Sequence, residues 1–154
     1  MTPLRQMSYE EFGKLRFLDF FPKTDQYVED HEGGLESGIG LACMEGYVLL
    51  TAFFTSPVDS EWATSEIEMR FGKNGCPEPE GNALLEKLGL ELRSGMPDNL
   101  VREVLGVSAQ VDLWPIVVGD QWPYYLGCAF GEGGLNRVWI CRKDLADAQT
   151  ELES

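Results

Sequence analysis

The chain has 154 residues, of which 44% are hydrophobic and 25% are charged, a composition typical of a folded globular domain and unlike that of a disordered segment. Twenty-six acidic residues stand against twelve basic ones, which gives a formal net charge of −14. Because such a charge repels phosphate backbones and anionic lipid head groups, it disfavours nucleic acid and membranes as partners and favours basic proteins.

The sequence has no apolar run of about 18 residues, the length that a helix needs to cross a bilayer. No apolar run typical of a signal peptide precedes Glu10 and Glu11, so we expect a cytoplasmic protein. No two cysteines form a C-x-x-C pair, and we expect free, reduced thiols, with a disulfide or a metal site as the alternative. The four cysteines are Cys43, Cys76, Cys128 and Cys141.

A first helix is expected at about residues 9–18. Ser8 is a favourable N-cap, and Glu11 stands three residues later, so the two residues can form a capping box over the first turn. Phe12 and Leu15 follow on one side of this helix, and Pro22 ends any continuation because proline cannot donate the next helical hydrogen bond.

Strand patterns follow and predict a first hairpin sheet within residues 26–71. Apolar residues alternate at Ile39, Leu41 and Cys43, which indicates a strand with one apolar face. Gly46 suits a tight turn after this strand, because glycine adopts the positive φ that hairpin turns need. The expected strands are 26–31, 39–43, 47–55 and 62–71, with 47–55 in a central position.

Two short helices are expected next, as a helical hairpin within residues 81–106. The first has Leu84, Leu85 and Leu88 on one side and ends at Gly89, a natural C-terminal stop. The second begins at Pro97 and ends at Gly106, since proline suits a helix start and glycine a helix end. Its expected buried stripe consists of Leu100, Val101, Val104 and Leu105.

The remaining pattern predicts C-terminal strands within residues 111–142, at 111–118, 124–130 and 136–142. The glycine-rich residues 131–134 indicate a hairpin between the last two, and a frayed helix is expected in the tail, 144–154. These elements together predict one α+β domain over 1–154. Its mostly antiparallel sheet is expected to carry the N-terminal helix and the helical hairpin on one face.

Residues suited to metal or catalytic chemistry are sparse. The one histidine, His31, stands among acids, and a solvated loop position is the simpler interpretation than a cation site, because neighbours on an extended chain point to opposite sides. The chain has no G-x-S-x-G nucleophile motif and no phosphate-binding loop. We therefore expect no enzyme, no catalytic residue, no cofactor and no metal. A hydrolase that uses two of the many carboxylates is an alternative.

The charges are unevenly distributed along the chain. No lysine or arginine occurs between Lys23 and Arg70, and that interval holds ten acids. Such a segment can steer a basic partner; the alternative is an acidic face that only keeps the protein soluble. Tryptophan is enriched at binding hot spots, although it is also an ordinary core residue; Trp122 is the best candidate for an exposed one. The candidate partner-binding residues are Asp25, Glu29, Asp30, Glu32, Glu36, Asp59, Glu61, Trp62, Glu66, Glu68 and Trp122.

Several short phrases of the chain are similar to those of one family of bacterial binding modules. They are GIGL at 38–41, GYV at 46–48, LGLEL at 88–92, the GMP-containing stretch 95–106 and the aromatic stretch 129–140. In this respect the chain resembles SmpA/OmlA and beta-lactamase-inhibitor-protein-like (BLIP-like) modules. It departs from them at Ser108, where the family often has proline.

That resemblance implies a helical hairpin packed on an antiparallel sheet and a surface that binds protein. Acidic cytoplasmic members of this type look like immunity proteins, so the resemblance implies an inhibitor that neutralises a basic bacterial toxin, as a monomer or weak homodimer. The alternatives are a structural or assembly module that dimerises through its C-terminal sheet, and the hydrolase named above.

Overall fold

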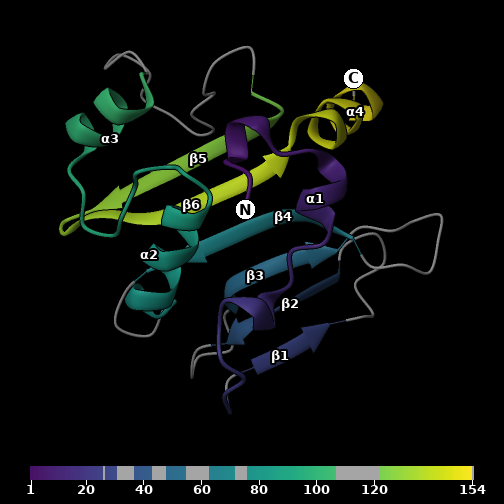
Figure 1. Cartoon of the computed structure of the whole chain (residues 1–154), viewed down its shortest axis with the longest axis horizontal. Coiled ribbons are helices and arrows are strands. Elements are labelled where there is room, and N and C mark those ends of the chain that lie inside the picture. The colour runs from purple at the N-terminus through teal and green to yellow at the C-terminus, as the bar shows by residue number, and fades with distance from the viewer. Residues whose placement is uncertain are drawn as a thin grey trace.

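The computed structural model describes residues 1–25, 27–30, 37–42, 48–54, 63–71, 76–106 and 122–153. Helices and one antiparallel sheet make up this part of the chain (Figure 1), which confirms the α+β class. The helical elements are the 3-10 helices η1 (Leu4–Gln6) and η2 (Phe17–Asp19) and the α-helices α1 (Tyr9–Gly13), α2 (Glu78–Lys87), α3 (Asp98–Leu105) and α4 (Lys143–Glu153). The strands are β1 (Tyr27–Asp30), β2 (Ser37–Ala42), β3 (Val48–Phe54), β4 (Thr64–Arg70), β5 (Tyr124–Gly131) and β6 (Gly134–Arg142).

The six strands form one sheet in the order β1-β2-β3-β4-β6-β5, and every neighbouring pair is antiparallel. The first four strands follow chain order, and the C-terminal hairpin then joins β4 through β6. The pairing runs from Glu66 opposite Cys141 to Arg70 opposite Arg137. The two strand groups predicted from the sequence are therefore parts of a single sheet.

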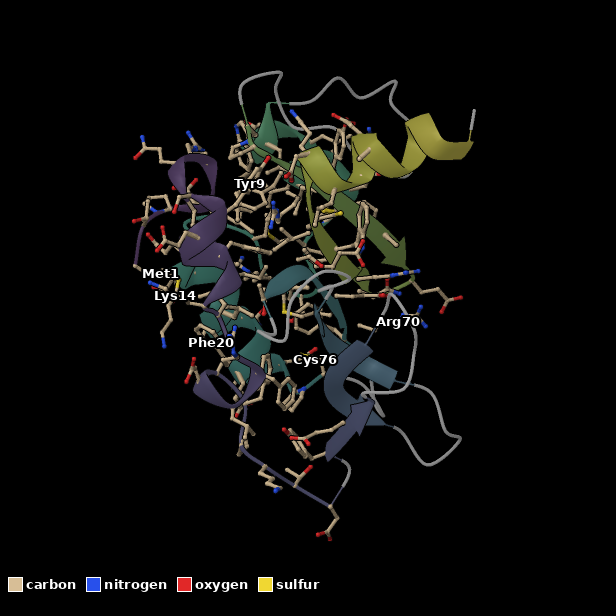
Figure 2. All side chains as sticks on the ribbon, turned by 90° about the vertical axis from the view of Figure 1, so that its right-hand side faces the viewer. Met1, Tyr9, Lys14, Phe20, Arg70 and Cys76 are labelled. Atoms are coloured by element: carbon tan, nitrogen blue, oxygen red, sulfur yellow. The ribbon has the colours of Figure 1, made fainter. Side chains whose placement is uncertain are left out.

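Apolar residues alternate along β4 and β6 and turn toward the same side. Ile67 lies opposite Ile140 and Met69 opposite Val138, and all four side chains are buried. Because directly paired residues share a face, these rows form the sheet's contribution to the core. Helices α1 and α2 lie on this side of the sheet (Figures 1 and 2). Full burial of each such side chain stabilises the fold by about 1.5–3 kcal/mol.

Helix α1 begins where the sequence predicts and ends earlier. The Ser8 hydroxyl accepts a hydrogen bond from the Glu11 amide at 3.1 Å, as an N-cap should. The helix stops at Gly13 because the next carbonyl groups are used elsewhere: Leu15 accepts a hydrogen bond from the Thr64 hydroxyl of β4 at 2.6 Å. The predicted helix over 9–18 is thus too long, and the short η2 replaces its last turn.

The second half of the predicted capping box is not formed. Instead of reaching back to Ser8, the Glu11 carboxylate accepts hydrogen bonds from the Thr2 amide at 3.1 Å and from the Thr2 hydroxyl at 2.8 Å. Glu11 therefore holds the start of the chain against α1, and Ser8 alone caps the helix.

Tyr124 fastens the N-terminal segment to the sheet. Its side chain is fully buried, its ring centroid lies 4.8 Å from that of Phe12, and its hydroxyl group lies 3.0 Å from the Met7 carbonyl oxygen and 3.1 Å from that of Ser8, either of which can accept its hydrogen bond. Burial also raises the pKa of this hydroxyl. The first residues of the chain thus pack on β5, a strand from the C-terminal part of the sequence.

Helix α2 ends as the sequence predicts. Gly89 has a φ of +70°, and the Leu90 amide donates to the Leu85 carbonyl at 3.1 Å, so the chain turns back on the last helical turn. The predicted apolar side is buried at Leu84, Leu85 and Leu88. Helix α3 likewise ends at Gly106, where φ is again +70°, with Val101 buried on its inner side.

The connection between these helices docks on the start of β6. The Gly95 amide donates to the Leu135 carbonyl at 2.9 Å, and the Leu135 amide donates to the Met96 carbonyl at 2.8 Å. At Gly134, φ is +95°, and the backbone of Gly95 lies so close that a Cβ atom would overlap its carbonyl group. Helices α2 and α3 are therefore linked to the predicted C-terminal hairpin, whose strands β5 and β6 are confirmed. Their packing as a helical hairpin stays a prediction.

Three sequence predictions lie outside the described residues. They are the turn at Glu45 and Gly46, the strand 111–118 and the position of His31. The predicted helix in the tail is present as α4, which begins directly after β6.

The close approach at Gly134 predicts a large difference between two neighbouring alanine substitutions. Gly134→Ala should lower the free energy of unfolding by about 3 kcal/mol, because the new methyl group meets the Gly95 backbone in a conformation that favours glycine. Gly133→Ala should change it by less than about 0.5 kcal/mol, since nothing lies within 4 Å of that position. Urea unfolding of both variants measures the difference, and equal losses would show that the contact with Gly95 is unimportant.

Candidate partner-binding surface

The described acids of the base-free segment lie at two separate places in the sheet. Asp25 and Glu29 are exposed at or just before β1, the outermost strand in the order. Asp30 ends that strand opposite Gly38. Glu66 and Glu68 lie on β4, with β2 and β3 between, which is about 14 Å away at the usual strand spacing.

The register also places these acids on opposite faces. Through paired residues of β2 and β3, Glu29 belongs to the same cross-strand row as Ile67, the buried residue on the helix side. Because successive residues of a strand alternate between faces, Glu66 and Glu68 point away from α1 and α2. These acids therefore do not form one continuous patch.

Of the remaining candidates, some lie outside the described ranges, and Trp122 lies within them. The former are Glu32, Glu36, Asp59, Glu61 and Trp62. Trp122 is partly buried and packs against the core, with the Arg5 guanidinium 5.1 Å from its ring centroid. Trp122, the best candidate for an exposed aromatic residue in the sequence, is therefore only partly exposed. It stands two residues before Tyr124, which is anchored in the core.

Glu68 is neutralised within the molecule. Its Oε1 atom accepts from the Arg70 Nε at 2.8 Å and lies 2.7 Å from the Arg137 Nη2, and its side chain is only 15% exposed. Arg70 and Arg137 face each other directly across β4 and β6, an arrangement that is unfavourable for like charges without a carboxylate between them. Glu68 thus contributes to the sheet and little to the acidic field outside.

Several other basic side chains lie against aromatic rings. Among the described residues, five cations lie over ring centroids at 4.3–5.3 Å, a geometry that is attractive for a positive charge. The pairs are Arg5 over Trp122, Lys23 over Tyr27, Lys87 over Phe20, Arg142 over Tyr9 and Lys143 over Tyr125.

Acidic side chains are mostly at the surface, where they outnumber the exposed bases. They occur on every described helix longer than four residues, on β1 and at the hairpin turn. The exposed acids are Glu10, Asp19, Asp25, Glu29, Glu78, Glu86, Glu91, Asp98, Glu103, Glu132, Asp144 and Asp147. Some of them form ion pairs: Glu10 pairs with the exposed Lys14, and Asp98 pairs with Arg102, whose side chain is buried.

The described cysteines are free thiols, as the sequence predicts for them, and all three are buried. Burial raises the pKa of the Cys76 thiol and that of the Cys128 thiol to about 12, and it also raises the pKa of Cys141. These groups are consequently protonated at neutral pH, which makes them poor nucleophiles. Cys43 lies outside the described ranges.

The described ranges contain neither a candidate metal site nor a membrane-spanning helix. No group of three or more histidine, cysteine, aspartate or glutamate residues is placed to hold a metal ion there. No helix in these ranges is both long and apolar enough to cross a membrane.

Comparison with known proteins adds no relative: no family model, no curated protein and no solved structure matches the chain. The resemblance to SmpA/OmlA and BLIP-like modules therefore stays a prediction.

The arginine pair beside Glu68 is not among the residues predicted from the sequence, where Arg70 marks only the end of the base-free interval. A signal was present, since Arg137 and Trp139 alternate with the buried Val138 and Ile140 and so had to face away from the core. The partner of β6 in the sheet, which brings Arg70 opposite Arg137, could not be read from that alternation.

The contacts of Glu68 predict that its charge stabilises the fold. Glu68→Gln leaves two guanidinium groups opposite each other and should lower the free energy of unfolding by about 1.5 kcal/mol. Glu132→Gln, at the exposed hairpin turn, is the matched control and should change it by less than about 0.5 kcal/mol. Urea titrations of both variants provide the measurement. A Glu68→Gln protein as stable as the control would mean that the ion pairs contribute nothing.

The raised thiol pKa values predict slow alkylation. A shift from 9.0 to about 12 lowers the thiolate fraction at pH 8 about a thousandfold, and burial adds a barrier to access. Cys76 and Cys128 should therefore react with iodoacetamide at least about 100-fold more slowly in the folded protein than in urea. Mass spectrometry of proteolytic peptides follows each residue separately. Equal rates in both states would contradict the burial of these thiols.

Proposed function

We propose that the protein is a non-catalytic binding domain for a basic protein partner. The observation that carries the proposal is the excess of acids at the surface: among the described residues twelve acids are exposed against five bases, which are Arg5, Lys14, Lys23, Lys87 and Arg93. With a net charge of −14, such a surface attracts a basic protein and accelerates its association.

In its specific form the proposal is a cytoplasmic immunity or inhibitor protein that neutralises a basic bacterial toxin. The short phrases shared with BLIP-like modules support this form, as does the protonated state of the described thiols, which favours binding over thiol chemistry. The toxin would be expected to present a cleft lined with lysine and arginine, which the acids would occupy in place of an anionic substrate. This specific form also includes the arrangement that the resemblance implies, in which a helical hairpin packs on one face of the sheet.

Toxin-neutralising proteins of this kind are encoded beside their toxins, so co-expression with the product of the adjacent gene is the direct test. We expect a complex that survives size-exclusion chromatography and protection of cells from that product. Neither a complex nor protection with either neighbouring gene product would contradict the specific form.

A charge-swap variant should show whether the exposed acids at β1 guide the partner. Asp25→Lys combined with Glu29→Lys should slow association about tenfold at low ionic strength and weaken its dependence on salt. Glu103→Lys combined with Glu132→Lys changes the net charge equally at exposed positions elsewhere. Stopped-flow or surface-based association rates compare the two. An equal effect of both pairs would show that only net charge matters, and no effect of either would contradict electrostatic steering.

A further inference from the structure

The charges of the chain are divided unevenly between its N-terminal segment and the rest. Residues 1–25 hold four acids and four bases, so the whole net charge of −14 belongs to residues 26–154. The surface shows the same division. Three acids and three bases of residues 1–25 are exposed, whereas the other described residues expose nine acids and only two bases. The exposed side chains of residues 1–25, which we call the N-terminal face, thus form a neutral area on a strongly acidic protein.

Large apolar side chains are exposed on the same face. Among the described residues, the exposed large hydrophobic ones are Met1, Leu18 and Leu145, and the first two belong to the N-terminal face. Met1 is 59% exposed and Leu18 49%, against 37% for Leu145 on α4. Figure 2 shows Met1, Lys14 and Phe20 together on the side of the molecule that the N-terminal segment forms. Apolar groups and balanced charges therefore occur on one face.

Leu18 is held in its exposed position by the aromatic residues around it. Its neighbour Phe17 is buried and stacks on Phe21, with ring centroids 5.0 Å apart. Phe20 packs against the core, and the Lys87 Nζ lies 5.3 Å from its ring centroid. Since these contacts fix η2, a partner that covers Leu18 does not have to order a flexible segment, which lowers the entropic cost of binding.

The exposed charges of the N-terminal face alternate in sign along the chain. In sequence order they are Arg5, Glu10, Lys14, Asp19, Lys23 and Asp25. Lys14 and Glu10 lie 3.5 Å apart, yet their side chains are 74% and 84% exposed, so both can also interact with a partner. A surface of mixed sign has no net repulsion toward a second copy of itself, and it can place opposite charges against each other.

We propose that the N-terminal face is the interface of a homodimer in which two copies meet across a twofold axis. In such an interface the same surface covers itself, so the acids of one copy can face the bases of the other. Leu18 supplies an apolar contact between the copies. Two proteins of charge −14 repel each other over most of their surfaces, and the neutral face is the one that a second copy approaches at the lowest electrostatic cost.

A second copy fits this face better than the basic partner proposed above. A basic protein is attracted to the acids in excess, and these belong to residues 26–154. The dimer and a basic partner therefore use different surfaces and can coexist. The dimer does not depend on the proposed function, so a strictly monomeric protein would contradict the dimer alone. Its interface also differs from the C-terminal sheet, the alternative interface expected from the sequence.

Sedimentation equilibrium of the full chain tests the dimer. The protein is measured between about 10 and about 500 μM at about 0.15 M ionic strength, where the screening length is about 8 Å. We expect a reversible monomer–dimer equilibrium with a dissociation constant on the order of 100 μM, as for a small and weak interface. A chain that stays monomeric over the whole range would overturn the proposal.

Two leucine substitutions form a matched pair. Leu18→Lys should weaken dimerisation at least about tenfold, because it replaces the apolar contact by a charge that meets its own copy. Leu145→Lys makes the same change outside the face and should alter the dissociation constant by less than about twofold. Both variants make the protein less negative, so a general charge effect would strengthen the dimer instead. Both leucines are exposed, and circular dichroism checks that the variants are folded.

A second matched pair tests the mixed charges. Lys23→Glu and Arg93→Glu each reverse the charge of one exposed base, but only Lys23 belongs to the N-terminal face. Lys23→Glu should weaken the dimer at least about fivefold and Arg93→Glu by less than about twofold. Equal losses within either matched pair, or a dimer that Leu18→Lys leaves unchanged, would overturn the proposal.

Hydrogen exchange at high and at low protein concentration locates the interface independently. We expect amides of residues 1–25 to exchange more slowly at the high concentration, where the dimer is populated. Slower exchange in β5 and unchanged exchange in residues 1–25 would place the contact at the C-terminal sheet and overturn the proposal.

Discussion

The pairing of β4 with β6 is the constraint on which the rest of the described structure depends. It joins four strands from the first half of the chain to the C-terminal hairpin, and it aligns Ile67 with Ile140 on the helix side of the sheet. The same register brings Arg70 opposite Arg137 on the other side, with Glu68 between them. A slip by one residue would exchange the two faces. Apolar burial and ion pairing therefore specify one and the same register.

Local features of this fold could be predicted from the sequence because their causes are local. The Ser8 cap, the helix end at Gly89 and the hairpin at residues 131–134 each depend on a few neighbouring residues. Strand order and face depend on contacts between distant segments, which alternation alone does not specify. The acids of the candidate site were found by their charge, but their division between two faces required the register. The burial of Trp122 likewise depends on Tyr124 and on the distant N-terminal segment.

Charge has two different uses in this molecule. At the surface the acids outnumber the bases and create a field that extends about a screening length into the solvent. On the sheet face away from α1 and α2, Glu68, Arg70 and Arg137 lie within contact distance of one another and are partly shielded from water, so their interactions are stronger and directional. The first kind of charge acts over a distance, whereas the second acts within the sheet, between residues in contact.

The contact of Tyr124 with the Met7 carbonyl joins positions that are 117 residues apart in the sequence. During synthesis the N-terminal segment leaves the ribosome long before the strand on which it packs has been made. Its apolar side chains, including Leu4 and Phe12, remain without their final partners until β5 and β6 emerge. Closing so long a loop makes folding slow relative to chains of similar size with local contacts. Until those strands are made, the apolar surface of the N-terminal segment stays exposed, the condition under which partly folded chains aggregate.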